Sequence, residues 1–499
     1  MTKARFMGAV AMATCLMAGA SLAQEAPLRI VLPSEPADID ACNTTVSNIG
    51  IIIKENVVET LTTLNPENSA VQPRLANGWT DQGNGTWRVT LREGVTFHDG
   101  AAFNAAAVAS SIARLQSEAI ACRDRTKIRG ITLTTAVVDD LTIDITADPP
   151  QVLMPTLLSF IGVGSPNTPA DQLSRAPVGT GPMKFVSWDS AGITVAQSGS
   201  YWGEKPAFET AQYIFRGESA LRASMVEIGE ADIAADIAPQ DAVNPATDIA
   251  FLNGETTRIR MVMKPPLDDV RVRKALNLAF DREALVGTLV SDKVLLSTQH
   301  FLPKINGYNP DLKVWPYDPE QAKALIDEAR AAGVPVDQEL RLVGRIGFYP
   351  NQLEVLQAMQ QMWAAIGLNV KVEMMESAEW LKLANKPYAD DRPAMLIQEM
   401  HDNNNGDAAF TMQFRYHSTG QQSEMAVPEI DALLDKALAA TGEERTKTFQ
   451  EANRIIADEI VPAVPMYHMV SFMRVGERIS YAPNSLSGSL IELADITPK

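Results

Sequence analysis

Several segments of the chain alternate apolar and polar residues, which is the pattern of a strand with one buried face. One of them follows Asn84-Gly85, a pair suited to the positive φ angles of a tight hairpin turn. Shorter apolar runs bounded by turn-forming residues have the composition of fully buried strands. The strands predicted in these two ways cover residues 28–32, 87–91, 141–145, 259–263, 340–343, 368–374 and 394–397.

Segments with helical periodicity lie between these strands. Asp318 can cap a helix that has a proline at its first position. A second helix is predicted over 350–367, where the final glycine closes the C-terminus, and two more follow Pro428 and Glu443. Because strands and helices are interspersed, without a repeat or a low-complexity tract, the sequence predicts an α/β or α+β protein.

The length of the chain indicates more than one lobe. It has 499 residues, 46% of them hydrophobic, and this exceeds the size at which single cores stop growing. Lys3 and Arg5 precede an apolar run and a small-residue cleavage site, so residues 1–23 are predicted to be a secretory signal peptide cleaved between Ala23 and Gln24. The net charge of −18 makes nucleic acid and anionic lipid poor partners.

Two cysteines, Cys42 and Cys122, remain once the signal peptide is removed. An exported protein can form disulfides, so the two could be joined. The alternative is a pair of buried thiols, since the sequence does not show whether their Cα atoms approach within the ~7 Å that a disulfide requires. Both alternatives stay open.

The sequence lacks the motifs that commonly carry catalysis. It has no Gly-x-Ser-x-Gly elbow, no phosphate loop ending in Gly-Lys-Ser/Thr, no His-Glu-x-x-His and no Cys-x-x-Cys. Its five histidines are scattered, and none has a second histidine at the helical spacing of a metal site. These features favour a protein that is not an enzyme and needs neither cofactor nor metal.

Several ordered motifs resemble those of a known family. The first is the hairpin strand followed by Gly-Val-Thr-Phe-His-Asp-Gly, and the whole set lies at 78–103, 177–182, 201–206, 229–232, 269–277 and 307–310. In this order they resemble the family 5 solute receptors, the periplasmic binding proteins of dipeptide, oligopeptide and nickel ABC importers. The resemblance extends from about residue 28 to about residue 480. A single motif would be weak, whereas the ordered set is specific.

The resemblance implies a two-lobed α/β fold of the type II periplasmic binding proteins, cluster C-like, with an extra domain inserted in lobe I. On that basis lobe I comprises residues 24–56, 186–264 and 471–499, the inserted domain 57–185, and lobe II 265–470. The chain would then cross between the lobes near 263–266 and near 467–472. Pro265-Pro266 supports the first crossing, because it ends the alternating run before it.

The resemblance also implies a ligand site between the lobes. Peptide receptors hold the ligand's ammonium group with an Asp at the position that appears here as Asn404, so a free peptide amino terminus is in question unless Asp402 or Asp407 replaces that Asp. Arg345 matches the Arg that grips the ligand carboxylate in dipeptide receptors, or else forms an internal salt bridge. The polar run around Asn404 could instead be a solvated loop of turn-forming residues.

Further polar residues complete the expected site. Asn43, Thr44 and Thr45 lie where lobe I of the family meets the ligand, or they only terminate a helix. His401 lies in the polar run, and Arg415 is a second candidate for an anionic group. The full set of expected ligand-binding residues is Asn43, Thr44, Thr45, Arg345, His401, Asp402, Asn404, Asp407 and Arg415.

The expected function is that of a monomeric periplasmic receptor, which captures a small solute and presents it to the permease of an ABC importer. A peptide is the first expectation for the solute. The departure at Asn404 keeps an opine, a modified sugar or a nickel chelate open. Two other classes compete, namely a secreted hydrolase on the same scaffold and a chaperone or signalling receptor without transport.

Overall fold

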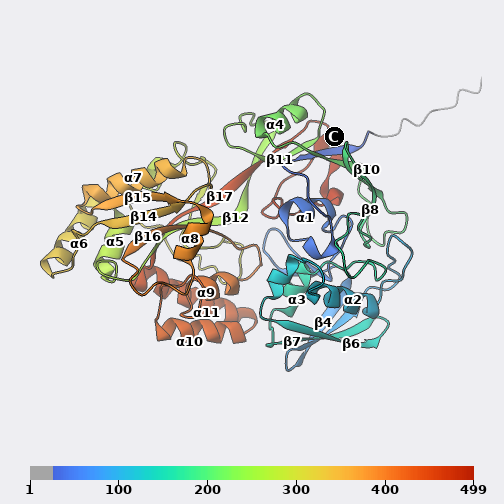
Figure 1. Ribbon diagram of the computed structural model, residues 1–499, viewed down its shortest axis with the longest axis horizontal. Helices are drawn as coiled ribbons and strands as arrows, with labels where there is room; N and C mark the ends of the chain where they lie inside the picture. The colour runs from blue at the N-terminus through green and yellow to red at the C-terminus, as the bar shows by residue number, and fades with distance from the viewer. Residues whose placement is uncertain (1–25) are drawn as a thin grey trace, which may run out of the picture.

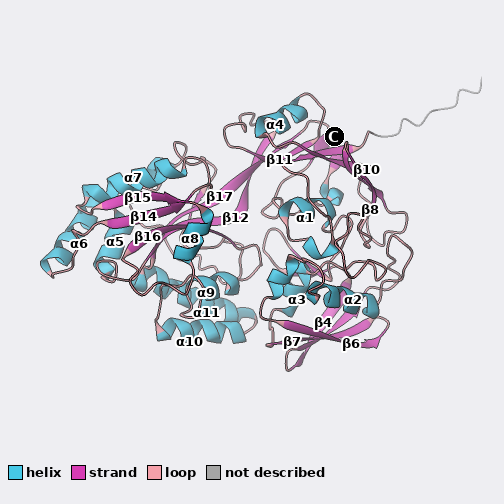
Figure 2. Cartoon of the chain, viewed as in Figure 1, coloured by secondary structure: helices cyan, strands magenta, loops and turns pink. Residues whose placement is uncertain are grey.

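The computed structural model describes residues 26–499, which form two lobes joined by two long strands (Figure 1). Lobe I lies on the right of the figure and lobe II on the left, and both contain strands and helices (Figure 2). The predicted signal peptide and its cleavage site lie outside the described residues. Among residues 26–499, no helix is both long enough and apolar enough to cross a membrane.

One sheet of eleven strands extends through both lobes. Its lobe I strands are β1 (Leu28–Leu32), β8 (Met183–Asp189), β9 (Gly192–Gln197), β10 (Thr210–Phe215) and β11 (Ile233–Ile237). Its lobe II strands are β13 (Leu295–Leu296), β14 (Leu340–Arg345), β15 (Val370–Met375) and β16 (Met395–Asp402). The shared strands are β12 (Asp248–Met261) and β17 (Ala463–Val475). The order is β15-β14-β16-β12-β17-β11-β1-β10-β9-β8, and β13 pairs with β17.

The strands β12 and β17 form the connection between the lobes. Their antiparallel pairing is interrupted between Leu252 and Thr256, where Gly254 has a φ of 89°. Residues of β12 after this interruption, such as Ile259, pack in the lobe II core, whereas Phe251 packs in the lobe I core. Strand β12 therefore passes from one core to the other between Phe251 and Ile259, upstream of the crossing at 263–266 that the sequence predicts. A proline pair marks the end of a strand, but burial decides to which core the strand belongs.

Within the segment predicted as an inserted domain, residues 76–148 contain a separate four-stranded antiparallel sheet, which has a core of its own. The sheet order is β4-β5-β7-β6, and helix α2 packs on it. Its elements are β4 (Ala76–Gly83), β5 (Thr86–Leu91), β6 (Thr132–Asp139), β7 (Thr142–Asp148), α2 (Ala105–Gln116) and α3 (Met154–Leu157). Asn84 and Gly85 have φ values of 51° and 77°, so the predicted hairpin is confirmed. The predicted domain boundary at 185 falls inside β8, which pairs in the large sheet.

Most helices cover lobe II. The predicted cap is confirmed, because the Asp318 side chain accepts a hydrogen bond from the backbone N–H of Gln321 at 2.9 Å. The lobe II helices are α5 (Val270–Leu278), α6 (Pro319–Ala331), α7 (Gln352–Ala365), α8 (Ser377–Ala384), α9 (Ala409–Arg415), α10 (Pro428–Ala439) and α11 (Gly442–Ile455). The remaining helices and strands are α1 (Ser47–Ile53), α4 (Ser219–Glu227), β2 (Thr62–Leu64), β3 (Val71–Pro73), β18 (Ile479–Ser480) and β19 (Thr497–Pro498).

Cys42 and Cys122 are free thiols in the structure, and both are buried in the core that packs against the four-stranded sheet. The Sγ of Cys122 donates a hydrogen bond to the backbone carbonyl of Cys42 at 3.0 Å. The pKa of Cys42 is raised by its hydrogen bond with Cys122 and by burial. Of the two alternatives left by the sequence, the structure contains the buried thiol pair.

Candidate ligand-binding groove

Two cavities lie between the lobes, and Asn253 of β12 lines both. The hinge cavity has a volume of about 910 Å³, and the polar pocket has a volume of about 230 Å³. The hinge cavity is lined by Ser219, Arg222, residues 236–240, Asn253, residues 288–291, Val294, residues 348–351, Met400 and residues 469–472. The polar pocket is lined by Thr44, Thr45, Ser47, Lys54, Thr63, Leu64, Lys127, Phe160, Asn253, Glu255, Asp402, Asn404, Asn405, residues 485–486 and residues 488–490.

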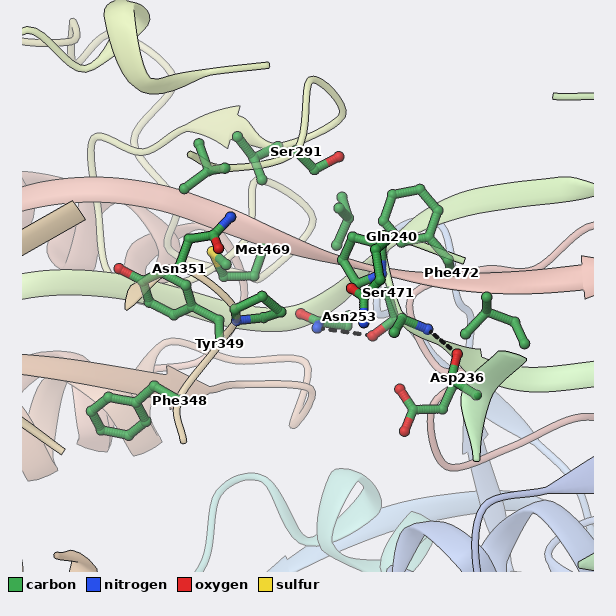
Figure 3. A pocket seen from close by; sticks show the side chains of 18 of the residues that line it. Asp236, Gln240, Asn253, Ser291, Phe348, Tyr349, Asn351, Met469, Ser471 and Phe472 are labelled. Carbon is green, nitrogen blue, oxygen red and sulfur yellow. Dashed lines mark hydrogen bonds between the residues drawn. The ribbon is translucent and has the colours of Figure 1, made fainter. Parts of the chain in front are cut away.

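The hinge cavity places loops of opposite lobes across the connecting strands (Figure 3). Tyr349 and Asn351 approach from the lobe II side, and Asp236 and Gln240 lie on the lobe I side. On the strands between them, the Nδ2 of Asn253 donates to the Oγ of Ser471 at 3.1 Å (Figure 3). The cavity therefore spans the bend between the two lobes.

The lobe I wall of the polar pocket is basic. The Nζ atoms of Lys54 and Lys127 lie 5.6 Å and 5.1 Å from the centre of the Phe160 ring. Burial lowers the pKa of Lys54, the nearby carboxylates of Glu55 and Asp124 act in the opposite direction, and the positive charge of Lys127 adds to the lowering. The Nζ of Lys127 also lies 3.5 Å from the Oδ1 of Asn405, a contact between the lobes. Two ammonium groups thus lie near one aromatic ring on the lobe I side of the polar pocket.

The opposite wall of the polar pocket is acidic. Glu255 and Asp402 are direct partners in the antiparallel pairing of β12 with β16, so both side chains project on the same face. Burial and the charge of Asp402 raise the pKa of Glu255 to about 7, although Arg345 and Arg415 act in the opposite direction. Two carboxylates of lobe II therefore face the pocket whose other wall carries the two lysines.

Asn404 lies next to these carboxylates. Its Nδ2 donates to the backbone carbonyl of Asn253 at 3.4 Å, and its Oδ1 is buried without a hydrogen-bond partner among the described residues. A Cβ on Gly254 would lie 2.2 Å from the Asn404 side chain, so only glycine fits at this bend. Asn404 thereby connects the polar pocket to the hinge.

Four of the residues expected at the site line the polar pocket, namely Thr44, Thr45, Asp402 and Asn404. The Oγ1 atoms of Thr44 and Thr45 donate to Asp124 at 2.9 Å and 2.5 Å, so these hydroxyls already have an internal acceptor. Asn43 is fully buried behind them, where its Nδ2 donates to Asp38 at 2.8 Å. Its side chain stabilises the loop and does not reach the groove.

Three further expected residues lie inside lobe II, where His401 is 6% exposed and Asp407 and Arg415 are each 5% exposed. The Nε2 of His401 lies 2.9 Å from the Oγ1 of Thr411. Asp407 accepts two hydrogen bonds from Arg445, at 2.7 Å and 2.9 Å, and Arg415 lies 2.8 Å from Glu399. The structure gives each of these groups an internal partner in place of the ligand that the sequence predicts.

Arg345 lies at the end of β14, beside the groove. Its guanidinium carbon is 4.1 Å from the ring centre of Phe348 and 5.8 Å from that of Trp380. Its Nε is buried without a hydrogen-bond partner, and within residues 26–499 no ion pair engages the guanidinium. The internal salt bridge considered as its alternative role is therefore not present among these residues.

The sequence analysis did not identify Lys54, Lys127, Phe160 and Glu255 as members of the groove. These residues come from separate segments of both lobes, and none of them stands in a motif with a chemical meaning of its own. The signal available was the Asn253-Gly254 pair ahead of the predicted strand at 259–263, since an Asn-Gly pair indicates a turn or a break in a strand. It would have located the bend, but not the lysines on the other lobe.

Three buried histidines make the stability of the fold depend on pH. Burial lowers the pKa of His300 and His401, nearby guanidinium groups add to this, and burial lowers the pKa of His468 to about 4. Since these values lie below the ordinary 6.5, the unfolded chain binds more protons in acid than the folded chain does. Their contribution to stability is therefore present above pH 6.5 and lost as the pH falls toward 4.

For His468→Gln, we expect stability to fall less between pH 7.5 and pH 5 than in the natural protein. A histidine that stays neutral in the fold lowers the free energy of unfolding by about 2 kcal/mol between pH 7.5 and pH 5, whereas glutamine binds no proton in either state. Urea unfolding at both pH values measures this difference, with the less buried His417→Gln as the matched control. Equal losses in His468→Gln and the natural protein would contradict the neutral, buried state of His468.

The comparisons with known proteins agree with this architecture. The family model described as bacterial extracellular solute-binding proteins, family 5 Middle, matches residues 70–423. The chain belongs to this family. Its members named in the comparisons are binding proteins, not enzymes. This confirms the resemblance on which the two-lobed fold was predicted.

Two curated relatives and one solved structure illustrate the similarity to other family 5 proteins. The chain is 26% identical to Di/tripeptide-binding protein 2 of Pseudomonas aeruginosa over 82% of this chain and 83% of that protein. It is 30% identical to the glutathione-binding protein GsiB of Salmonella typhi over 61% of each chain. HbpA2 from Haemophilus parasuis has the same fold, with a TM-score of 0.81, 22% identity and coverage of 95% of this chain and 100% of that one.

Proposed function

We propose that this family 5 protein is the periplasmic receptor of an ABC importer and that it binds a peptide in the groove between its lobes. The observation that carries the proposal is that residues of both lobes line two cavities, and that the strands β12 and β17 connect these lobes. A solute in this groove touches both lobes at once. It would be delivered unchanged to the permease, with no bond made or broken.

Binding would be coupled to a bend at Gly254. Gly254 has a positive φ, and the pairing of β12 with β17 is broken around it. The backbone here is therefore less constrained than the paired strands on either side. A solute that contacts both lobes binds the closed arrangement better than the open one, and this difference shifts the equilibrium toward closure. The permease would recognise the closed arrangement.

A peptide is the ligand that the combined observations favour. The relatives described above are named for dipeptides, tripeptides and glutathione. The polar pocket offers carboxylates on one wall and ammonium groups on the other, and peptides carry both complementary charges. An opine, a modified sugar or a nickel chelate are the alternative solutes within the same class.

A panel of dipeptides and tripeptides, including glutathione, is expected to contain at least one ligand of micromolar affinity. Such a ligand, at 100 times its dissociation constant, stabilises the fold by about 2.7 kcal/mol. Titration calorimetry measures the affinity, and urea unfolding with and without the ligand measures the stabilisation. A neutral disaccharide, an opine and a nickel chelate provide the comparison. If these bind while every peptide fails, the peptide assignment is wrong, and if nothing binds, the receptor assignment loses its support.

A further inference from the structure

We propose that Lys304 of lobe II resists closure of the groove, because its ammonium group loses water against lobe I without gaining a counter-ion there. The solute then has to overcome this resistance when the lobes close on it, and it is released more readily when they open. This inference rests on the proposed function, since it concerns the closure by which the same groove holds a solute. Lys304 lies outside the set of ligand-binding residues expected from the sequence.

The backbone that carries Lys304 is fixed to lobe II. Phe301 and Ile305, on either side of it in the chain, are 0% and 2% exposed and pack with α9 and α11 in one core. The backbone N–H of Asn306 donates to the carbonyl of Gly406 at 3.2 Å, which joins this loop to the loop that follows β16. When the lobes approach each other, Lys304 is therefore carried toward lobe I.

Both hydrogen-bond acceptors of Lys304 belong to the lobe I side. Its Nζ donates to the backbone carbonyl of Pro66, in the turn between β2 and β3, at 3.4 Å, and to the Oγ of Ser485 in the C-terminal segment. Within residues 26–499, no carboxylate forms an ion pair with it. Both acceptors are neutral, so separating the lobes returns the ammonium group to water.

Other contacts show that Lys304 lies in an interface between the lobes. A Cβ on Gly406 would lie 3.1 Å from the backbone oxygen of Ser69, and the Nζ of Lys127 lies 3.5 Å from the Oδ1 of Asn405. The loop with Gly406 is the one to which the Lys304 loop is hydrogen-bonded. The burial of Lys304 thus depends on the lobes being together.

The balance between lost hydration and the two new contacts decides whether Lys304 holds the lobes together or opposes their approach. Burial lowers the pKa of Lys304 to about 8, so the charged form is disfavoured in this arrangement. Hydrogen bonds to two neutral acceptors do not offset the loss of water around an ammonium group that has no carboxylate beside it. The charge therefore opposes the approach of the lobes.

Lys304→Met tests this resistance, because it removes the charge and keeps an unbranched side chain. In the protein without solute, we expect the closed population to rise about 10-fold, as long as closure is the minor state. Spin labels at Gln82→Cys and Glu429→Cys report it, since β4 and α10 belong to opposite lobes (Figure 1). The natural cysteines are buried and do not compete for the label.

The affinity for a peptide should follow the closed population. Calorimetry with the dipeptide or tripeptide of the panel that binds most tightly should give about 10-fold tighter binding to Lys304→Met, because the apparent affinity scales with the population that is competent to bind. Lys371→Met is the matched control, since Lys371 is an exposed lysine on β15, the end strand of the sheet in lobe II. It should change neither the distances nor the affinity.

Ser485→Asp tests the missing counter-ion directly. A carboxylate at this position lies beside the Nζ of Lys304 when the lobes are together, and it compensates the desolvated charge. We expect the closed population to rise in Ser485→Asp. In Lys304→Met/Ser485→Asp it should fall below that of Lys304→Met, because the new carboxylate is then the group that loses water without a partner.

Two results would overturn the proposal. A smaller closed population in Lys304→Met would show that Lys304 fastens the lobes together, and an unchanged one would show that closure does not desolvate its charge. Urea unfolding verifies that each variant is folded. The distances are measured without solute, so they remain informative if no peptide binds. In that case the proposed function fails, while the expected change in distance would still support the role of Lys304 in closure.

Discussion

Replacing Glu399 by glutamine is expected to lower the free energy of unfolding by about 3–5 kcal/mol, because it leaves three buried arginines without their shared counter-ion. The carboxylate of Glu399 is fully buried in β16. It lies 2.8 Å from Arg258, 3.1 Å from Arg260 and 2.8 Å from Arg415. Burial alone would raise the pKa of Glu399, but the three guanidinium groups outweigh it and lower the pKa to about 2.

Urea unfolding at pH 7.5 measures this effect. Glu373→Gln is the matched control, since Glu373 pairs with Arg341 on a more exposed part of the same sheet and should change stability little. If Glu399→Gln is as stable as Glu373→Gln, the arginines have another counter-charge. The experiment also bears on Arg415, because a guanidinium needed for this cluster is not free to bind an anionic ligand.

Replacing Asp407 by asparagine is expected to have an effect of similar size, about 3–5 kcal/mol, with ligand affinity unchanged. Asp407 accepts two hydrogen bonds from Arg445, whose side chain is 2% exposed, and a third from Asn306 at 2.8 Å. The substitution leaves the charge of Arg445 buried and unpaired. It does not alter the carboxylates of Glu255 and Asp402, which line the polar pocket.

The free energy of unfolding and the ligand affinity of Asp407→Asn are to be measured in the same buffer. Glu443→Gln is its control, since Glu443 forms an exposed pair with Lys447 on the helix that carries Arg445. The contrary result would be an Asp407→Asn variant that keeps its stability but binds peptides with a free amino terminus more weakly. Asp407 would then be the ammonium acceptor that the sequence analysis considered, and the internal role described here would be wrong.

Local chemistry was sufficient to predict many elements of the fold. The hairpin at Asn84-Gly85 depends on two residues that accept a positive φ, and α6 begins where Asp318 caps it. The buried strand Leu28–Leu32 and the helices α10 and α11 were likewise evident from apolar spacing. These features depend on residues close to one another in the chain, so the sequence expresses them directly.

The groove was predicted only in part, because its residues are brought together by folding. Asp402 and Asn404 follow a strand end and could be recognised as polar groups at the edge of a sheet. Asp407 and Arg415 are equally polar and lie nearby in the chain, but their partners are Arg445 and Glu399 inside lobe II. Whether a polar side chain faces a cavity or an internal partner depends on contacts with distant segments.

Motif order and residue spacing specify the family, the two-lobed α/β architecture and several of the strands and helices, since these are properties of the linear chain. The break in β12–β17 pairing around Gly254, and the position of Lys54 and Lys127 in one pocket with Glu255 and Asp402, follow from three-dimensional packing. The pairing register of β12 with β16, and the approach of two lobes, set these positions. Both arise from packing between segments far apart in the chain, which no local pattern records.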